Sequence, residues 1–336
     1  MEPPASLVRS RELVEPALVA AVEELAEELL PAIRYHFGWA TADGARVEED
    51  SGKRLRPALA LLSAEAVGAH PQVALPGAVA VELIHNFSLI HDDVIDGDTE
   101  RRHRPTVWTC FGTDEALIAG DALHSLAFQV LLAEALPPRV ASAQRLVGAT
   151  TAMIAGQAAD MAFDDVPMVT LTDCRVMEEA KTGALLGYAA SVGAVLAEAE
   201  AKVINALEKY GRQLGLAYQA VDDVLGIWGD SAVTGKPAGN DLRERKKSMP
   251  VAVVLSLGGK ASEGLTQIYG RCGDLDDEDV ARAAAIIESA GGREATLAEA
   301  QRCLETALGA LDGADLNSGV LHELEQVARF VVERDA

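Results

Sequence analysis

The sequence predicts an all-α protein that forms one domain over residues 1–336. Apolar residues recur at spacings of three and four through most of the chain, which is the pattern of amphipathic helices. No segment shows convincing strand alternation, and no repeat of fixed period occurs. Aromatic residues make up only 4% of the chain, while Ala, Leu, Val and Glu are frequent, which favours helix over sheet. A hydrophobic content of 49% is ample for a core.

The periodic stretches place roughly ten or more helices along the chain. The clearest of them cover residues 13–33, 56–69, 75–96, 116–136, 144–163, 174–199, 201–228 and 327–335. Proline, glycine or polar residues separate them at 41–52, 70–76, 97–106, 137–138, 164–173, 229–250 and 273–279. None of these breaks is long enough for a domain linker.

Charge and cysteine content exclude several classes of protein. The net charge of −23 argues against nucleic-acid binding, which needs a net-positive face. The four cysteines are widely spaced, without the CxxC pair of a zinc site, and no secretory signal precedes them. No uninterrupted apolar run reaches about eighteen residues, so no transmembrane helix is expected. We therefore expect a cytoplasmic protein with reduced thiols.

The first acidic cluster, Asp92, Asp93 and Asp96 in DDxxD, ends the predicted helix 75–96. Asp92 and Asp96 are four residues apart and share a face, where they repel each other and the negative end of the helix dipole. A divalent cation such as Mg²⁺ would remove that conflict. His85 lies on the same stripe of the helix. On its own the motif also fits a helix end that simply faces solvent.

A second acidic cluster changes this interpretation. Gln219, Asp222 and Asp223 lie on the predicted helix 201–228 among apolar residues. Buried carboxylates without a partner are costly, so a metal or a cation should accompany them. Two aspartate-bearing helices that face each other can hold several Mg²⁺ ions and bind a pyrophosphate leaving group.

A pyrophosphate site also needs fixed positive charge. Taken singly, each candidate fits an ordinary surface cation, except Lys181, whose neighbours are small and apolar. The candidates are Lys53, Arg56, Arg101, Arg102, Lys181, Lys236, Lys246 and Lys247.

Six motifs in order, GKRLRP, ELIHNFSLIHDDVIDGDTERR, GDAL, KTGALL, YQAVDDVLGIWGD and GKPAGNDL, resemble the trans-prenyltransferases. These are the isoprenyl diphosphate synthases, such as geranylgeranyl diphosphate synthase, and the likeness spans about residues 50–255. The resemblance implies an isoprenoid synthase helical bundle around a central catalytic cavity, usually a homodimer. It also implies Mg²⁺-dependent, head-to-tail condensation of isopentenyl diphosphate with an allylic diphosphate.

The same resemblance implies a role for each site residue. Asp92, Asp93, Asp96, Asp222 and Asp223 would hold Mg²⁺, three ions when diphosphate is bound. The allylic diphosphate would contact Arg101, Lys181, Lys236 and Lys246, and isopentenyl diphosphate would contact Lys53, Arg56, His85 and Arg102. Thr182 and Gln219 would turn their oxygens toward the developing carbocation.

In this family, the residues just before the first acidic motif set product length. Phe87 and Ser88 stand five and four positions before Asp92. An aromatic residue at the fifth position resembles the farnesyl and geranylgeranyl synthases, and the two-residue insertion common in bacterial farnesyl synthases is missing. The sequence therefore favours geranylgeranyl diphosphate as the product, with farnesyl diphosphate next.

Three positions depart from the family pattern. Ser51 and His103 stand where glycines are usual, and Gly226 replaces the last aspartate of the second motif. Asp222, Gly226 and Asp230 have the spacing of a terpene cyclase metal motif, so a cyclase of related fold is an alternative. The missing carboxylate also admits a third reading, a non-catalytic partner subunit of a prenyl synthase.

Overall fold

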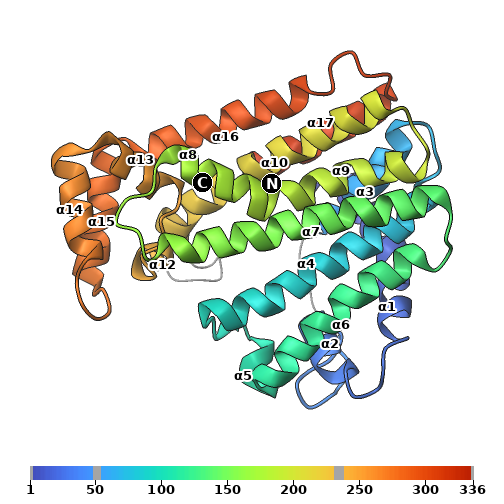
Figure 1. The fold of residues 1–336 in the computed structure, drawn as a ribbon, viewed down its shortest axis with the longest axis horizontal. Coiled ribbons are helices and arrows are strands. Elements are labelled where there is room, and N and C mark those ends of the chain that lie inside the picture. The colour runs from blue at the N-terminus through green and yellow to red at the C-terminus, as the bar shows by residue number, and fades with distance from the viewer. Residues whose placement is uncertain (1–2, 48–53, 231–237, 334–336) are drawn as a thin grey trace.

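The computed structural model describes residues 3–47, 54–230 and 238–333. Almost every described element is a helix, and the long helices run side by side along the longest dimension of the molecule (Figure 1). The long helices are α1 (Ala5–Val22), α3 (Leu55–Ala66), α4 (Leu75–Asp96), α6 (Thr113–Leu132), α7 (Pro137–Phe163), α9 (Ala184–Leu196), α10 (Ala201–Trp228), α16 (Gly292–Gly309) and α17 (Ser318–Val332). The all-α prediction is confirmed.

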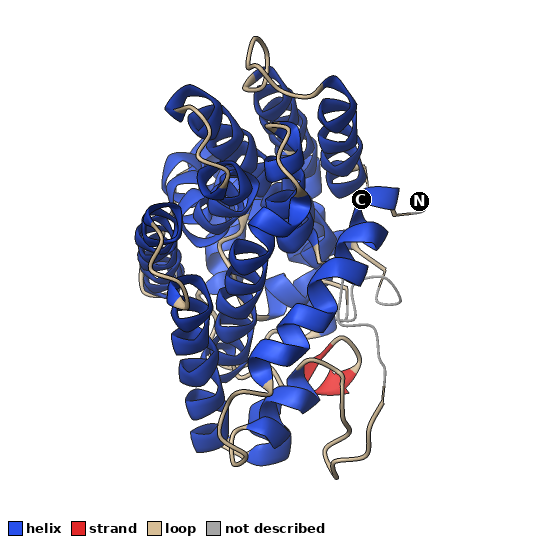
Figure 2. Ribbon diagram, turned by 90° about the vertical axis from the view of Figure 1, so that its right-hand side faces the viewer, coloured by secondary structure: helices blue, strands red, loops and turns tan. Residues whose placement is uncertain are grey.

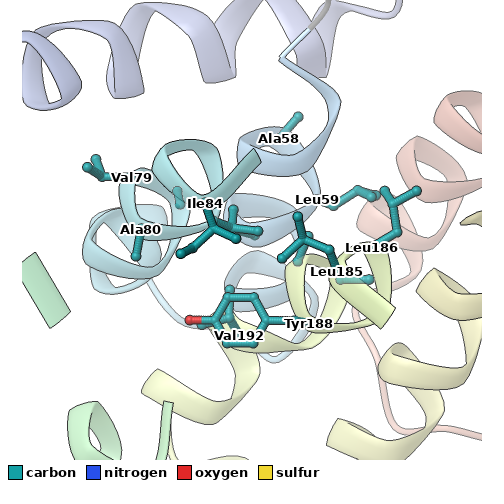
Figure 3. Packing of buried hydrophobic residues seen from close by; sticks show 14 of the residues in the cluster. Ala58, Leu59, Val79, Ala80, Ile84, Leu185, Leu186, Tyr188 and Val192 are labelled. Carbon is teal, nitrogen blue, oxygen red and sulfur yellow. The ribbon is translucent and has the colours of Figure 1, made fainter. Parts of the chain in front are cut away.

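Helix α9 is the centre of the bundle. All its residues are buried, and it packs against α3, α4, α7 and α10. Leu59 of α3, Ile84 of α4 and Val192 of α9 meet in this core (Figure 3). A helix that is apolar all round needs neighbours on every side, and this requirement fixes where α4 and α10 stand.

The predicted helix 13–33 is in fact two helices, α1 and α2 (Leu30–His36). Pro31 lies in the first turn of α2, where its missing N–H costs no hydrogen bond. A continuous helix through Pro31 would lose a bond and bring the ring against the carbonyl four residues earlier. Periodicity alone did not reveal this break.

The predicted helix 174–199 is interrupted by one π-helical turn. Helix α8 (Leu171–Glu178) leads into η2 (Glu179–Gly183), and α9 follows. The π-turn holds Lys181 and Thr182. Gly156 of α7 permits the close approach, because a Cβ there would lie 2.3 Å from the backbone nitrogen of Lys181. Such π-bulges within longer helices often lie at functional sites.

The segment between α4 and α5 (Val107–Phe111) forms a small hairpin, drawn in red in Figure 2. Strand β1 (Glu100–Arg101) pairs with β2 (Arg104–Pro105) in antiparallel register. Arg102 and His103 make the turn with φ of 53° and 61°. Positive φ at both central residues matches the twist of a tight hairpin, and it explains why glycine would suit position 103.

A smaller apolar cluster lies at the end of the bundle near α14 and α15, drawn in orange in Figure 1. It is built around Leu242, Leu265 and Ile287. The shorter elements there and elsewhere are η1 (Pro71–Ala74), α12 (Asn240–Arg243), α13 (Met249–Leu257), α14 (Gly259–Tyr269) and α15 (Asp277–Ser289). The single-domain assignment stays a prediction.

Two helical stretches, residues 71–96 and 113–132, are long and apolar enough to cross a membrane by length and composition. In the first stretch, 67% of the apolar window is buried inside the bundle, and in the second 39%. Core helices pass the same test, so length and apolarity are weak evidence. The expected absence of a transmembrane helix stays a prediction.

Candidate active site

A cavity of about 1260 Å³ opens between α4, α7, η2 and α10. Most of the residues singled out in the sequence line it, although they come from distant parts of the chain. They are Arg56, His85, Phe87, Ser88, Asp92, Asp96, Arg101, Arg102, Lys181, Thr182, Gln219, Asp222, Asp223 and Lys246. Lys53 and Lys236 lie outside the described residues, so their predicted roles stay predictions.

The first acidic motif divides its carboxylates between two faces of α4. Asp92 and Asp96 line the cavity, and neither has a hydrogen bond or an ion pair within the described part of the chain. Burial raises the pKa of Asp92 to about 6, and the neighbouring Asp96 adds to that rise. Burial also raises the pKa of Asp96. The charge of Lys181 opposes both rises without cancelling them, so a further cation would stabilise both carboxylates.

Asp93 points away from the cavity and is only 2% exposed. Its Oδ1 accepts a hydrogen bond of 2.6 Å from Nε of Arg101. This pair ties the β1–β2 hairpin to α4 and holds Arg101 at the cavity wall.

The second acidic motif divides in the same way. Asp222 and Asp223 both line the cavity, but both oxygens of Asp223 are engaged. Its Oδ1 accepts from Nε2 of Gln219 at 2.8 Å, and its Oδ2 accepts from the backbone N–H of Met249 at 2.7 Å. Burial raises the pKa of Asp223 to about 6, and these two bonds oppose the rise. Asp223 is thus an anchor for α13 as well as a candidate ligand.

Thr182 extends this network into the π-turn. Its Oγ1 donates to Oε1 of Gln219 at 2.9 Å, while Gln219 donates to Asp223. The threonine oxygen keeps its lone pairs for the cavity, because its own proton goes to Gln219. The hydrogen bonds thus fix Oγ1 of Thr182 and Oε1 of Gln219 at the cavity wall, where their lone pairs could stabilise a carbocation.

The donor set fits Mg²⁺ by its chemistry. All the candidate ligands are carboxylate oxygens, which Mg²⁺ prefers. Asp92 and Asp96 make no ion pair with a described residue, although the charge of Lys181 acts on both. Among the described side chains, no three His, Cys, Asp or Glu residues converge on one point. Phosphate oxygens and water would have to complete each coordination sphere, which is the usual arrangement for Mg²⁺.

Arginines and a neutral histidine line another part of the cavity. Arg56 and Arg102 face it beside His85. Burial, reinforced by Arg56 and Arg102, holds the pKa of His85 well below its ordinary value. Nε of Arg56 is buried without a hydrogen-bond partner among the described residues. A charged donor left in this state is suited to an incoming anion.

Two lysines near the acidic motifs are already paired. Nζ of Lys181 lies 2.6 Å from Oδ2 of Asp160, and Nζ of Lys246 lies 2.8 Å from Oε2 of Glu244. Burial would lower the pKa of Lys246, but Asp241 and Glu244 outweigh it and raise that pKa. Lys246 therefore stays charged beside the carboxylates.

The family model described as Polyprenyl synthetase matches residues 44–287, which is most of the chain. The chain belongs to the polyprenyl synthetase family. It is an enzyme of the trans-prenyltransferase class, as the sequence predicted. The alternatives of a terpene cyclase and a non-catalytic partner subunit gain no support from these similarities.

Similar proteins cover nearly the whole chain. The (2E,6E)-farnesyl diphosphate synthase of Mycobacterium tuberculosis is 44% identical over 97% of this chain and 92% of its own length. The geranylgeranyl diphosphate synthase of the same organism is 41% identical over 92% of this chain and 89% of its own. A solved polyprenyl synthetase from Streptomyces coelicolor is 48% identical with a TM-score of 0.92, covering 98% of this chain and 99% of its own.

Sequence reasoning missed several residues of the cavity. Asp160 and Gln157 lie on α7, and Oε1 of Gln157 is buried without a hydrogen-bond partner in the part of the chain described. Glu178 is 2% exposed beside Asp223, and burial raises its pKa well above its ordinary value. Their spacing gave a usable signal: Gln157 and Asp160 are three apart on an apolar helix, and Glu178 lies three residues before Lys181.

Phe87 forms a wall of the apolar part of the cavity. It is 8% exposed, and its ring meets those of His91 and His124 edge-on at 4.9 Å and 5.1 Å. Ser88 is partly buried and donates to the backbone oxygen of His85 at 2.8 Å. Of these two lining residues, Phe87 is therefore the bulky one.

The buried side chain of His36 makes the stability of the fold depend on pH. Burial, with help from Arg102 and Arg101, lowers the pKa of His36 to about 3, and its Nε2 lies 3.0 Å from Oδ1 of Asn86. The unfolded chain takes up this proton near pH 6.5, so stability is complete above that value and is lost as pH falls toward 3. In that window, protonation of His36 in the unfolded chain lowers the free energy of unfolding by up to about 1.4 kcal/mol per pH unit. We expect His36→Gln to remove this pH dependence.

Urea denaturation of both proteins at a series of pH values measures this difference. His322→Gln, at an exposed position on α17, is the matched control and should keep the wild-type slope. Equal slopes for wild type and His36→Gln would contradict the prediction.

Proposed function

We propose that this enzyme condenses isopentenyl diphosphate with an allylic diphosphate, head to tail, to give a short-chain all-trans prenyl diphosphate. Members of the family use these two substrates and depend on Mg²⁺ in general. The observation that carries the proposal is one cavity with two chemically distinct anion sites. Asp92 and Asp96, which make no ion pair with a described residue, suit a diphosphate that arrives with metal, while Arg56 and Arg102 suit one that arrives without it.

The reaction begins when the carbon–oxygen bond of the allylic diphosphate breaks and the diphosphate leaves with the electron pair. Bound Mg²⁺ would supply the charge that stabilises this leaving group. Lys181 and Arg101 lie where they can hold its oxygens, at the cavity wall beside the first motif. The double bond of isopentenyl diphosphate then forms the new carbon–carbon bond, and transfer of a proton to the released diphosphate restores a double bond.

The allylic cation needs protection from water. It also needs electron-rich groups nearby that stabilise its positive charge. Thr182 and Gln219 offer oriented oxygens from the network with Asp223. Leu89, Met153 and Leu185 supply apolar wall. Together they would favour attack by the alkene over quenching by water.

We propose geranylgeranyl diphosphate as the product, with farnesyl diphosphate as the second candidate. The resemblance at position 87 and the missing insertion in the first motif support the first. The 44% identity to a farnesyl diphosphate synthase supports the second. A wall formed by Phe87, His91 and His124 supports a short product in either case.

A product assay tests the function directly. The purified protein is incubated with Mg²⁺, labelled isopentenyl diphosphate and each allylic diphosphate in turn. We expect label in a prenyl diphosphate, and a loss of roughly a hundredfold or more in Asp92→Asn. Asp114→Asn, at an exposed carboxylate of α6, should keep wild-type activity. A cyclic hydrocarbon formed from a prenyl diphosphate alone, or no product in any mixture, would contradict the proposal.

The size of Phe87 leads to a prediction about product length. Phe87→Ala removes the ring between His91 and His124, and the growing chain should extend beyond the wild-type product. Phe111→Ala is the matched control, because Phe111 packs on Tyr35 and does not line the cavity. Chromatography of the dephosphorylated products measures chain length. Unchanged length in Phe87→Ala would show that another residue limits the product.

We also propose that the enzyme is a cytoplasmic homodimer. The support for a dimer is a stripe of apolar residues on the exposed face of α7. Val140, Val147, Ile154 and Met161 recur every seven residues and are 37%, 51%, 51% and 50% exposed. On the neighbouring α6, Ile118 is 54% exposed. An exposed apolar stripe of this kind marks an interaction surface, chiefly at Val140 and Val147, since Ile154 and Met161 also line the cavity.

A charge in the stripe should separate the subunits. Val147→Glu places a carboxylate at its centre, and we expect the mass measured by light scattering to fall from dimer to monomer. Val8→Glu changes an equally exposed valine on α1 and should leave the dimer intact. A monomeric wild-type protein, or a Val147→Glu variant that remains dimeric, would refute this interface.

A further inference from the structure

Gly226 leaves a space on α10 that another residue fills. It stands one turn after Asp222, and both line the cavity. A Cβ at position 226 would lie 2.1 Å from Oδ2 of Asp241, 2.5 Å from its Cγ and 3.0 Å from its Oδ1. Any side chain at 226 would therefore displace the Asp241 carboxylate. In the motif that the sequence resembles, an aspartate stands at position 226.

Asp241 reaches this position from α12, on the far side of the loop that follows α10. It lines the cavity, and its carboxylate makes no hydrogen bond or ion pair with any described residue. The nearby Lys246 is paired with Glu244 at 2.8 Å. Burial raises the pKa of Asp241 to about 7, and the charge of Lys246 opposes that rise while Asp223, Glu244 and Asp222 add to it. Several carboxylates therefore share one lysine, and a further cation would stabilise them.

We propose that Asp241 is the third carboxylate of the second acidic motif, taking from α12 the place that Gly226 leaves open on α10. In this position it faces the divalent cations that bind with the allylic diphosphate, directly or through their water molecules. The glycine is then a requirement of the site rather than a lost ligand. This inference rests on the proposed function, since it assumes that metal binds together with a diphosphate.

Metal binding tests this inference without turnover. Mn²⁺ is titrated into the full-length protein in the presence of inorganic pyrophosphate, and the heat of binding is measured. Asp241→Asn should weaken Mn²⁺ binding by about tenfold or more, while wild type and Asp277→Asn bind alike. Asp277 is an exposed carboxylate paired with Arg243 of the same α12, so it is a matched control. Thermal denaturation of Asp241→Asn without metal checks that the variant is folded.

An exchange of positions gives a second test. Gly226→Asp alone drives two carboxylates together and should also weaken Mn²⁺ binding by about tenfold. The double variant Gly226→Asp, Asp241→Gly returns the carboxylate to α10, and we expect Mn²⁺ affinity to recover to within about threefold of wild type.

Two results would overturn the inference. One is an Asp241→Asn protein that keeps wild-type Mn²⁺ affinity while the wild type is active in the product assay. The other is lost activity with unchanged Mn²⁺ binding, which would mean that Asp241 acts through Lys246. Failure of the proposed function is distinguishable, because the wild-type protein itself would then give no labelled product.

Discussion

The active site depends on one unfavourable interaction, the repulsion between carboxylates that the fold holds close together in the absence of metal. Asp92 and Asp96 share one face of α4, where burial and mutual repulsion raise the pKa of Asp92 to about 6. The charge of Lys181 opposes this rise without cancelling it, and neither carboxylate forms an ion pair with a described residue. This repulsion lowers the stability of the metal-free protein. The packing of the rest of the bundle compensates for that loss and fixes the positions of α4 and α10. The fully buried helix α9 between α4 and α10 supplies that rigidity.

In each acidic motif, one aspartate is bound to protein groups while its neighbour faces the cavity. Asp93 binds Arg101 and anchors the hairpin, so Asp92 remains available to the cavity. Asp223 binds Gln219 and the backbone of Met249, so Asp222 is held beside it. Of two adjacent aspartates on one helix, one therefore holds the local structure and the other is placed to bind metal. The proposed role of Asp241 extends the same principle to a carboxylate that comes from a different helix.

The sequence was most informative where periodicity is unbroken. Helices α4 and α10 have the predicted bounds of 75–96 and 201–228, and both carry motifs whose spacing sets the facing side chains. The π-turn at Lys181 was not predicted from the sequence, and the close approach that accompanies it involves Gly156 on another helix. The pairing of Asp160 was not predicted either. Its partner Lys181 is 21 residues away in the sequence, so only the fold brings the pair together.

The central claim is that the two acidic motifs face each other across one metal–diphosphate site. Crystals grown with Mn²⁺, isopentenyl diphosphate and an allylic thiolodiphosphate that does not ionise would test it most directly, since anomalous scattering locates each ion. We predict ions bound by Asp92 and Asp96 on one side and by Asp222 on the other, bridged by the oxygens of the allylic diphosphate. Ions at any other place, or a diphosphate bound away from both motifs, would contradict the account.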